Sequence, residues 1–250
     1  MSIGLPFAYP EPSLQRLFED QGPGPWWLRD IRPKLCRGRL AHAYIPYAES
    51  VTHRLEKLED PNSYRVAGIS QKHDTATRPI HVVGLPRNRG NSDWGLLPCK
   101  RRPVLVLGLG GVPVSKEIKI GRSKWRFSET CTVAPFFSVS GGSTAPLPET
   151  FVEGVRLCAY PQYIWDQCPN DRGQDDEGSV LYLNQLQPMG AASLQLTPYR
   201  LHDAALTLVD EWISWSLTGE LLSWDTENLN LSFYREYLLE GISLEIYQDL

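Results

Sequence analysis

The sequence predicts a mainly β fold of the α+β class, a small and strongly bent antiparallel barrel closed by one late helix. Short runs of strand length follow one another, separated by Gly, Pro and polar turn residues. These strand patterns rarely alternate with helical patterns, which argues against a doubly wound parallel sheet. The clearest helical pattern comes late in the chain, over residues 198–218.

Size and composition limit the class of protein. The 250 residues are 42% apolar and 22% charged, with 8 Trp and 11 Tyr, which excludes a mainly disordered, collagen-like or coiled-coil chain. No apolar run approaches the ~18 residues of a membrane span, and the N-terminus lacks the pattern of a secretion signal. The 5 Cys are scattered without a CxxC pair. We therefore expect a cytoplasmic protein of one or two domains with reduced thiols.

The first third of the chain contributes little regular structure. Five prolines among the first 25 residues, together with Gly22 and Gly24, predict an irregular N-terminal arm over residues 1–36. A first strand is expected over 37–47, where a strand pattern begins. Residues 48–79 are polar and rich in helix breakers, with one helical turn at 53–59. Residues 78–86 form the next expected strand.

The middle of the chain supplies the centre of the sheet. Residues 101–108, RRPVLVLG, include a continuous apolar run of strand length. Residues 117–120 and 124–128 alternate apolar with polar side chains on either side of a Gly-Arg-Ser turn, which predicts a hairpin with one wet face. A further strand is expected over 130–139, followed by a loop rich in Ser and Gly.

The C-terminal part combines two strands with the late helix. The strands are expected over 154–160 and 178–184. The helix, over 198–218, has Thr197 as its N-cap and Gly219 as its C-cap. Its apolar positions recur at spacings of three and four residues and predict one stripe that faces the core: Leu201, Ala205, Leu208, Trp212 and Trp215.

Charge is distributed unevenly, although the net charge is only −4. Residues 87–126 carry ten Lys and Arg against two acids, whereas residues 151–250 carry four Arg against sixteen Asp and Glu. A basic centre beside an acidic C-terminal part predicts an anionic ligand at the centre. A solvated, internally neutralised surface explains the same distribution, so both interpretations stay open.

Familiar nucleotide and hydrolase motifs are absent. The segment GLGGVP at 108–113 has Pro113 where a dinucleotide-binding loop needs its third Gly, and the pattern behind it is that of a strand. A lysine-containing phosphate loop is missing, and SVSGGS at 138–143 lacks the leading Gly of a hydrolase elbow. The 5 His show no ligand spacing with Cys or carboxylates. We therefore expect neither a metal nor a cofactor.

The candidate site that survives is an Arg pair at the start of the buried strand, Arg101 and Arg102. The planar fork of Arg donates two parallel hydrogen bonds to a phosphate and keeps its charge. About thirty residues further along, the next strand ends in Ser138 and Ser140. A solvated Arg pair at a strand end explains the residues alone equally well, so the pattern by itself does not decide.

Four segments and a closing helix occur in a suggestive order. The segments are RGRLAHAYIPY (37–47), RRPVLVLG with Arg102-Pro103, TVAPFFSVS (132–140) and GSVLYLNQLQPM (178–189) with Gln185. This order resembles that of the MazF/PemK family of toxin endoribonucleases. The resemblance implies a small Src-homology-3-like barrel of the CcdB/PemK type. The chain is more than twice the usual family length, and the excess lies in the N-terminal arm, an insertion at about 48–97 and a tail after residue 219.

The resemblance implies a growth-inhibiting, dimeric toxin that cleaves single-stranded RNA without a metal. In that reaction the 2′-hydroxyl attacks its own phosphate, and the enzyme supplies a charge clamp, an acid and a base. Arg102 would be the clamp. The family's catalytic Thr falls at Phe137, so Ser138 would replace it if a one-residue bulge presents the Ser hydroxyl. Without that hydroxyl, the resemblance implies a non-catalytic binding module in a toxin–antitoxin, defence or regulatory assembly.

Further residues would hold the RNA in a basic groove. The candidates combine cationic groups for the backbone with one ring for stacking and one amide: Lys100, Arg101, Lys124, Trp125, Arg126 and Gln185. Family antitoxins are acidic segments that fill the RNA groove. The acidic residues 220–250, predicted to contain a short helix and a strand, would fill it in cis or form an oligomer or partner surface.

Overall fold

The computed structural model describes residues 3–4, 9–46, 53–57, 63–68, 80–81, 94–111, 114–121, 129–141, 145–169, 178–221 and 230–240. The chain divides into two compact units. The first unit combines residues 1–43 with residues 102–250, and the second comprises residues 44–101. The predicted insertion at 48–97 falls within the second unit.

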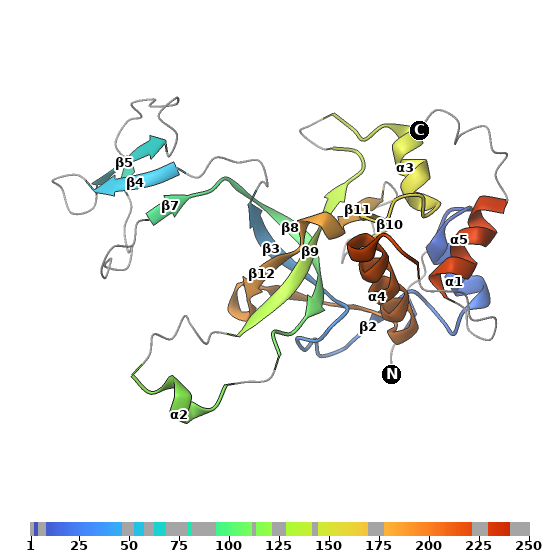
Figure 1. Cartoon of the computed structure of the whole chain (residues 1–250), viewed down its shortest axis with the longest axis horizontal. Coiled ribbons are helices and arrows are strands. Elements are labelled where there is room, and N and C mark those ends of the chain that lie inside the picture. The colour runs from blue at the N-terminus through green and yellow to red at the C-terminus, as the bar shows by residue number, and fades with distance from the viewer. Residues whose placement is uncertain are drawn as a thin grey trace. The chain divides into compact units, whose positions relative to one another are not determined.

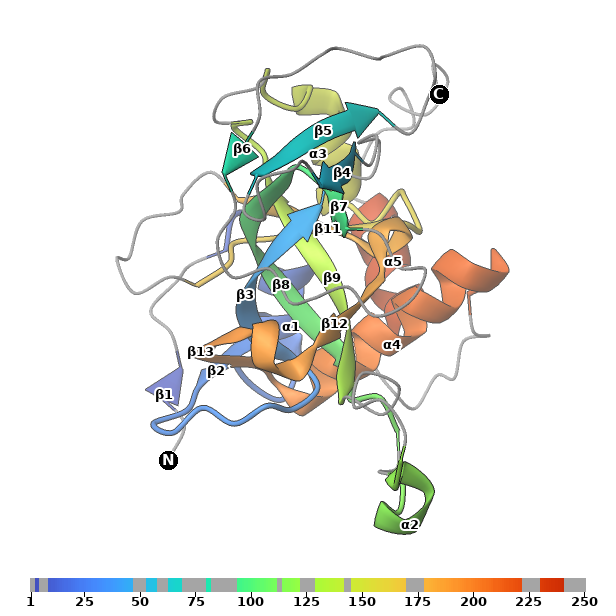
Figure 2. The ribbon, with the colours of Figure 1, turned by 90° about the vertical axis from the view of Figure 1, so that its left-hand side faces the viewer.

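The first unit is built on a curled antiparallel sheet (Figures 1 and 2). In the described part of the chain its strand order is β1-β2-β13-β3-β8-β9-β11-β10, and β12 also pairs with β9. The strands are β1 (Ile3–Gly4), β2 (Trp27–Arg29), β3 (Arg39–Pro46), β8 (Cys99–Gly108), β9 (Thr130–Ser138), β10 (Tyr163–Asp166), β11 (Ser179–Tyr182), β12 (Gln187–Gly190) and β13 (Gln195–Leu201). The predicted α+β class is confirmed, and the curled sheet is compatible with a small barrel.

Helices lie against this sheet and close its core. They are α1 (Leu14–Gln21), α3 (Glu149–Arg156), α4 (Asp203–Thr218) and α5 (Leu231–Glu240), with the 3₁₀ turns η2 (Leu183–Gln185) and η3 (Ala191–Ser193). The short helix α2 (Lys116–Lys119) has no buried residue and is not part of this core. Figure 1 shows α1, α4 and α5 gathered on one side of the sheet. Trp26, Trp27, Phe18, Trp212 and Tyr234 are each at most 2% exposed and anchor the core.

The second unit contains a small antiparallel sheet. Its described strands, in the order β6-β5-β4-β7, are β4 (His53–Lys57), β5 (Ser63–Gly68), β6 (Ile80–His81) and β7 (Trp94–Leu96). The helical turn predicted at 53–59 is therefore wrong. Residues 53–57 pair along their length with β5, and cross-strand pairing overrides their local helical pattern. Of the strand predicted at 78–86, Ile80 and His81 form β6 and the rest lies outside the described residues.

Several predicted strands are confirmed. Residues 37–47 contain β3, residues 101–108 lie within β8, residues 130–139 contain β9, and residues 178–184 begin with β11. The apolar run of β8 is buried from Val104 to Leu107, because this strand lies between β3 and β9 in the sheet. A central strand that is buried on both faces appears in the sequence as a continuous apolar run, which makes it the easiest kind of strand to predict.

The late helix begins five residues later than predicted. Residues 195–201 form β13, which pairs with β2 and β3, and the N-cap of α4 is His202, whose Nδ1 accepts from the Ala204 N–H at 3.2 Å. Thr197 instead donates its hydroxyl to the Leu40 carbonyl at 2.7 Å. Gly219 is the C-cap, as predicted, with φ of +76°. The predicted stripe residues on α4 are buried: Ala205, Leu208, Trp212 and Trp215.

Three other predictions are corrected. Residues 154–160 do not form a strand, because α3 continues to Arg156 and a turn follows it. Residues 117–120 do not begin a hairpin: Glu117 to Lys119 lie in the short helix α2, and its predicted partner strand at 124–128 lies outside the described residues. The N-terminal arm is not wholly irregular either. It contains β2 and α1, whose N-cap Ser13 accepts from the Arg16 N–H at 3.2 Å.

The acidic tail contributes to the core of the first unit. Its predicted short helix is α5, on which Leu231, Tyr234 and Leu238 are buried against α1 and α4. The Leu231 N–H donates to the Glu211 carboxylate at 2.7 Å, and Arg235 Nε donates to the Cys158 carbonyl at 3.2 Å. Residues 231–240 are therefore structural. The strand predicted near the end of the chain lies outside the described residues.

Candidate nucleic-acid interface

The guanidinium of Arg102 lies against an aromatic ring of the neighbouring strand. The β8–β9 register pairs Val104 with Pro135, and two residues further along it brings Arg102 opposite Phe137. The guanidinium carbon is 4.1 Å from the centroid of the Phe137 ring. Both side chains are half-buried. A cation–π contact of this kind contributes about 0.5 to 2 kcal/mol, depending on desolvation, and it restrains the position of the guanidinium.

Phe137 is the first ring of a row that crosses three further elements. Tyr182 of β11 lies 4.4 Å from Phe137, and Tyr163 of β10 lies 4.8 Å from Tyr182, measured between ring centroids. Phe151 of α3 is 5.4 Å from Tyr163 and also 5.4 Å from Tyr160. Register explains the row, since Tyr163 pairs directly with Tyr182 across β10 and β11. We call Arg102 and these five half-buried rings the Arg102 face.

The Tyr182 hydroxyl is electrostatically coupled to the cation of this face. Burial raises the pKa of Tyr182 above its ordinary value, the neighbouring Tyr163 raises it further, and the charge of Arg102 lowers it. The hydroxyl therefore stays protonated at neutral pH and can serve as a hydrogen-bond donor. The face thus combines a fixed cation, a phenolic donor and several ring surfaces.

Ser138 lies at the exposed end of β9. Its Oγ is 2.8 Å from the Oγ of Ser140. The β9–β11 register runs without a shift through Phe136, Phe137 and Ser138, so the bulge that would present Ser138 is absent from this pairing. Because side chains alternate along a strand, Ser138 extends from the opposite face of β9 to Phe137. The structure therefore does not present Ser138 in the position of Phe137, and its catalytic role stays a prediction.

The other predicted binding residues are scattered. Lys100 and Arg101 are exposed on β8 and belong to the second unit, whereas Arg102 begins the second segment of the first unit. Gln185 ends the 3₁₀ turn η2 directly after β11 and is half-buried. The predicted residues Lys124, Trp125 and Arg126 lie outside the described residues.

A buried carboxylate was missed by the sequence analysis. Asp166 ends β10, is only 3% exposed, and accepts hydrogen bonds from three aromatic side chains. Tyr9 Oη donates at 3.1 Å, Trp26 Nε1 at 3.0 Å and Trp27 Nε1 at 3.1 Å. Burial raises the pKa of Asp166 to about 7, although these hydrogen bonds act in the opposite direction. The cluster ties the N-terminal arm to the sheet, and its signal in the sequence is no more than a Trp pair and a distant Asp.

Metal-site geometry, membrane-spanning helices and comparisons with known proteins do not assign a function to this chain. Among the described residues, no group of His, Cys, Asp or Glu is arranged to hold a metal ion. No helix within the described ranges is long and apolar enough to cross a membrane. No protein-family model matches the chain, and no curated protein matches its sequence. Membership of the MazF/PemK family therefore stays a prediction from the four segments.

Proposed function

We propose that this chain binds single-stranded RNA at the Arg102 face. The observation that supports this is the Arg102 guanidinium stacked on Phe137 at the end of a row of rings. Sites for single-stranded nucleic acid combine cationic groups that hold phosphates with aromatic rings and Arg planes on which bases stack. The face provides both kinds of group on one sheet and the helix α3 beside it.

The stacked arrangement suits two contacts of Arg102 at once. The guanidinium carbon lies 4.1 Å from the centroid of the Phe137 ring, so a base that stacks on the neighbouring rings would lie beside the cation. The N–H groups of a guanidinium lie in its plane and are suited to phosphate oxygens, so Arg102 would hold the phosphate of that nucleotide. A ring that holds the Arg in place lowers the entropy lost when RNA binds.

The arrangement favours binding over cleavage. Transfer of the phosphate to the 2′-hydroxyl requires a base for that hydroxyl and an acid for the leaving oxygen. Tyr182 is protonated at neutral pH and can donate a proton, but for the same reason it is a poor base. The binding module is therefore the leading proposal. A growth-inhibiting endoribonuclease that acts as a homodimer is the second, and it rests on the resemblance.

Binding is tested with the full chain and a labelled, unstructured RNA of about 20 nucleotides, a length that spans more than one typical site. Arg102→Gln removes the cation and should weaken binding by about tenfold, since one stacked base contributes roughly 1–3 kcal/mol. Arg29→Gln is the matched control, because Arg29 is an exposed Arg of β2 in the same unit. Equal affinities of the wild type and Arg102→Gln, measured by fluorescence anisotropy, would refute the proposal.

The same RNA separates binding from cleavage. After incubation, products are probed for new 5′-hydroxyl ends, the expected product of 2′-hydroxyl attack. New ends with the wild type that are lost with Arg102→Gln would support the endoribonuclease. Binding without new ends would support the module. Expression of both proteins in bacteria then shows whether growth inhibition follows the cleavage activity.

A further inference from the structure

A basic pocket of about 510 Å³ lies in the first unit, beside the loop before β3 and the end of β13. Five cationic side chains line it: Arg32, Lys34, Arg37, Arg39 and Arg200. Two carboxylates, Asp30 and Asp203, share the wall, and Arg37 pairs with Asp210 outside the lining, which leaves an excess of two positive charges. The pocket involves none of the residues of the Arg102 face.

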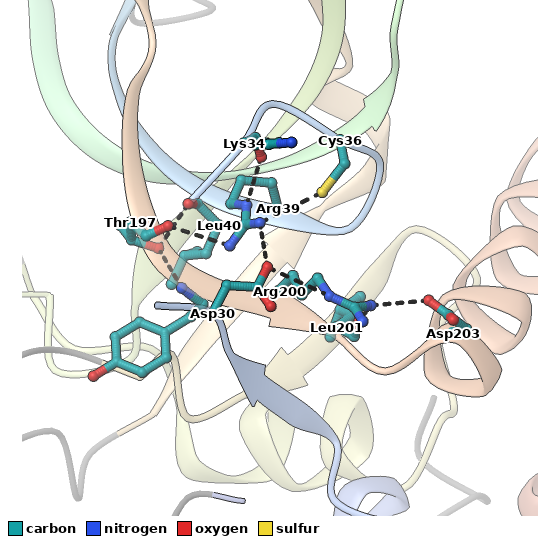
Figure 3. A network of polar contacts seen from close by, with 10 residues as sticks. Asp30, Lys34, Cys36, Arg39, Leu40, Thr197, Arg200, Leu201 and Asp203 are labelled. Carbon is teal, nitrogen blue, oxygen red and sulfur yellow. Dashed lines mark hydrogen bonds and ion pairs between the residues drawn. The ribbon is translucent and has the colours of Figure 1, made fainter. Parts of the chain in front are cut away.

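Arg39 forms a rigid part of this wall (Figure 3). Its side chain is only 1% exposed, which is rare for a charged residue. Nε donates to the Lys34 carbonyl at 3.0 Å, Nη1 donates to the Thr197 carbonyl at 3.4 Å, and Nη2 donates to the Asp30 carboxylate. Nη2 also lies 3.7 Å from the Cys36 sulfur. These bonds fix the loop that carries the other cations.

Both carboxylates of the wall are already engaged. Asp30 Oδ2 accepts from Arg39 and lies 3.5 Å from Nε of Arg200. Asp203 accepts from Nη1 of Arg200 at 2.9 Å. Figure 3 shows this chain of alternating charges from Arg39 through Asp30 and Arg200 to Asp203. The four groups neutralise one another, so they stabilise the wall without repelling an anion from it.

The positive charge that remains comes from the loop. Arg32 and Lys34 are exposed, and the described part of the chain provides no carboxylate within ion-pair distance of either side chain. Arg37 donates Nε to the Leu107 carbonyl at 2.7 Å and pairs with Asp210. An Arg fork and a Lys ammonium over a fixed, neutralised wall are the groups that bind phosphate oxygens.

We propose that this pocket binds a compact phosphate ligand of high charge, either free diphosphate or the 5′-terminal phosphate of a nucleic acid. Both sources present several anionic oxygens within a few ångströms. The pocket volume of about 510 Å³ accommodates either group together with its ordered water. This proposal does not depend on RNA binding at the Arg102 face.

Cys36 provides a direct readout, because its half-buried thiol lines the pocket. Cys131, Cys158 and Cys168 are buried, and Cys99 is exposed, so Cys99→Ser leaves Cys36 as the accessible thiol. Iodoacetamide is uncharged, so its rate reports access and not attraction of the reagent. Peptide mapping by mass spectrometry assigns the labelled residue.

Inorganic diphosphate at ten times its dissociation constant should slow labelling of Cys36 by about tenfold. Arg32→Gln with Lys34→Gln should abolish this protection, and both side chains are exposed, so the fold is expected to persist. Lys116→Gln with Lys119→Gln removes the same charge from α2 and should leave protection intact. Equal protection in the two double variants, or none in the Cys99→Ser protein, would overturn the proposal.

Two oligonucleotides of one sequence, with a 5′-phosphate or a 5′-hydroxyl, distinguish the two sources. If the 5′-phosphorylated oligonucleotide protects Cys36 and the 5′-hydroxyl oligonucleotide does not, the ligand is a terminal phosphate. If only diphosphate protects Cys36, the ligand is free diphosphate. Equal protection by both oligonucleotides, lost in Arg102→Gln, would mean that RNA at the Arg102 face shields Cys36, which contradicts recognition of a terminal phosphate in this pocket. Failure of the pocket proposal therefore appears in the labelling of Cys36. Failure of the RNA-binding proposal appears instead as an RNA affinity, measured by anisotropy, that Arg102→Gln leaves unchanged.

Discussion

Arg102 and Phe137 face each other across two neighbouring strands, with the guanidinium carbon 4.1 Å from the ring centroid. The resemblance to the toxin endoribonucleases places a hydroxyl residue where this chain has Phe137. A ring at that position provides no proton relay, but it holds the Arg and continues into a row of rings. Relative to the pattern of that resemblance, Phe137 provides a stacking surface in place of a catalytic hydroxyl, which is why binding is the leading proposal.

Phe137 and Arg102 should be coupled in RNA binding. Phe137→Leu keeps an apolar side chain but removes the ring, so Arg102 loses its support and we expect affinity to fall several-fold. In a double-mutant cycle with Arg102→Gln, the two losses should not add, and the coupling energy should be about 0.5–1 kcal/mol. Anisotropy titrations of the four proteins measure it. Additive losses would show that the two residues act independently.

Stability should fall as pH rises because of Asp166. Its pKa is raised from an ordinary value near 3.8 to about 7 by burial, so the folded state binds the proton more tightly than the unfolded state. The contribution of this proton to stability is fully present below about pH 4 and is lost as the pH rises through about 7. Between these limits the slope approaches about 1.4 kcal/mol per pH unit.

Asp166→Asn tests this pH dependence, since the neutral amide resembles the protonated acid. The urea-derived free energy of unfolding should fall from pH 5 to pH 7 more steeply for the wild type than for Asp166→Asn. Glu220→Gln is the control, because Glu220 is exposed, and it should keep the wild-type slope. Parallel curves for the wild type and Asp166→Asn would show that Asp166 ionises in the fold as it does in water.

The sequence predicts the fold best where the pattern of a single segment is enough to identify its structure. The buried run of β8 and the apolar stripe of α4 are properties of single segments. β13 was mistaken for helix because Pro198 suits a first helical turn, and only its pairing with β2 and β3 shows that it is a strand. The helix α3 was missed because its apolar residues have an equally good strand interpretation.

The candidate site was predictable only in part, for a similar reason. The run of Arg before an apolar strand pointed to Arg102. The rings of its face come from β9, β11, β10 and α3, and no local pattern brings Phe137, Tyr182, Tyr163 and Phe151 together. The Asp166 cluster joins residues more than 130 positions apart. Such sites depend on register and on tertiary packing.

Arg39 should not be replaceable by Lys. Lys carries the same charge, but it cannot reach the Lys34 and Thr197 carbonyls and the Asp30 carboxylate at once. Breaking a buried ionic network by removing one partner costs about 3–5 kcal/mol, and we expect Arg39→Lys to cost a substantial part of that. Arg29→Lys on the exposed side of β2 should cost less than about 0.5 kcal/mol. Urea denaturation compares the two, and equal midpoints would contradict a structural role for the Arg39 fork.

Two glycines separate backbone strain from steric overlap. Gly219 and Gly178 have nearly the same positive φ, +76° and +75°. An added Cβ at Gly219 meets nothing within 4 Å, whereas one at Gly178 would lie 2.6 Å from Nε1 of Trp165 in the core. Gly219→Ala should therefore cost only the strain of the left-handed conformation, about 1 kcal/mol. Gly178→Ala carries the same strain and must also displace a buried indole, so its loss of unfolding free energy should be at least twice as large. Thermal and urea unfolding of both variants measure the difference, and equal losses would mean that Trp165 yields without cost.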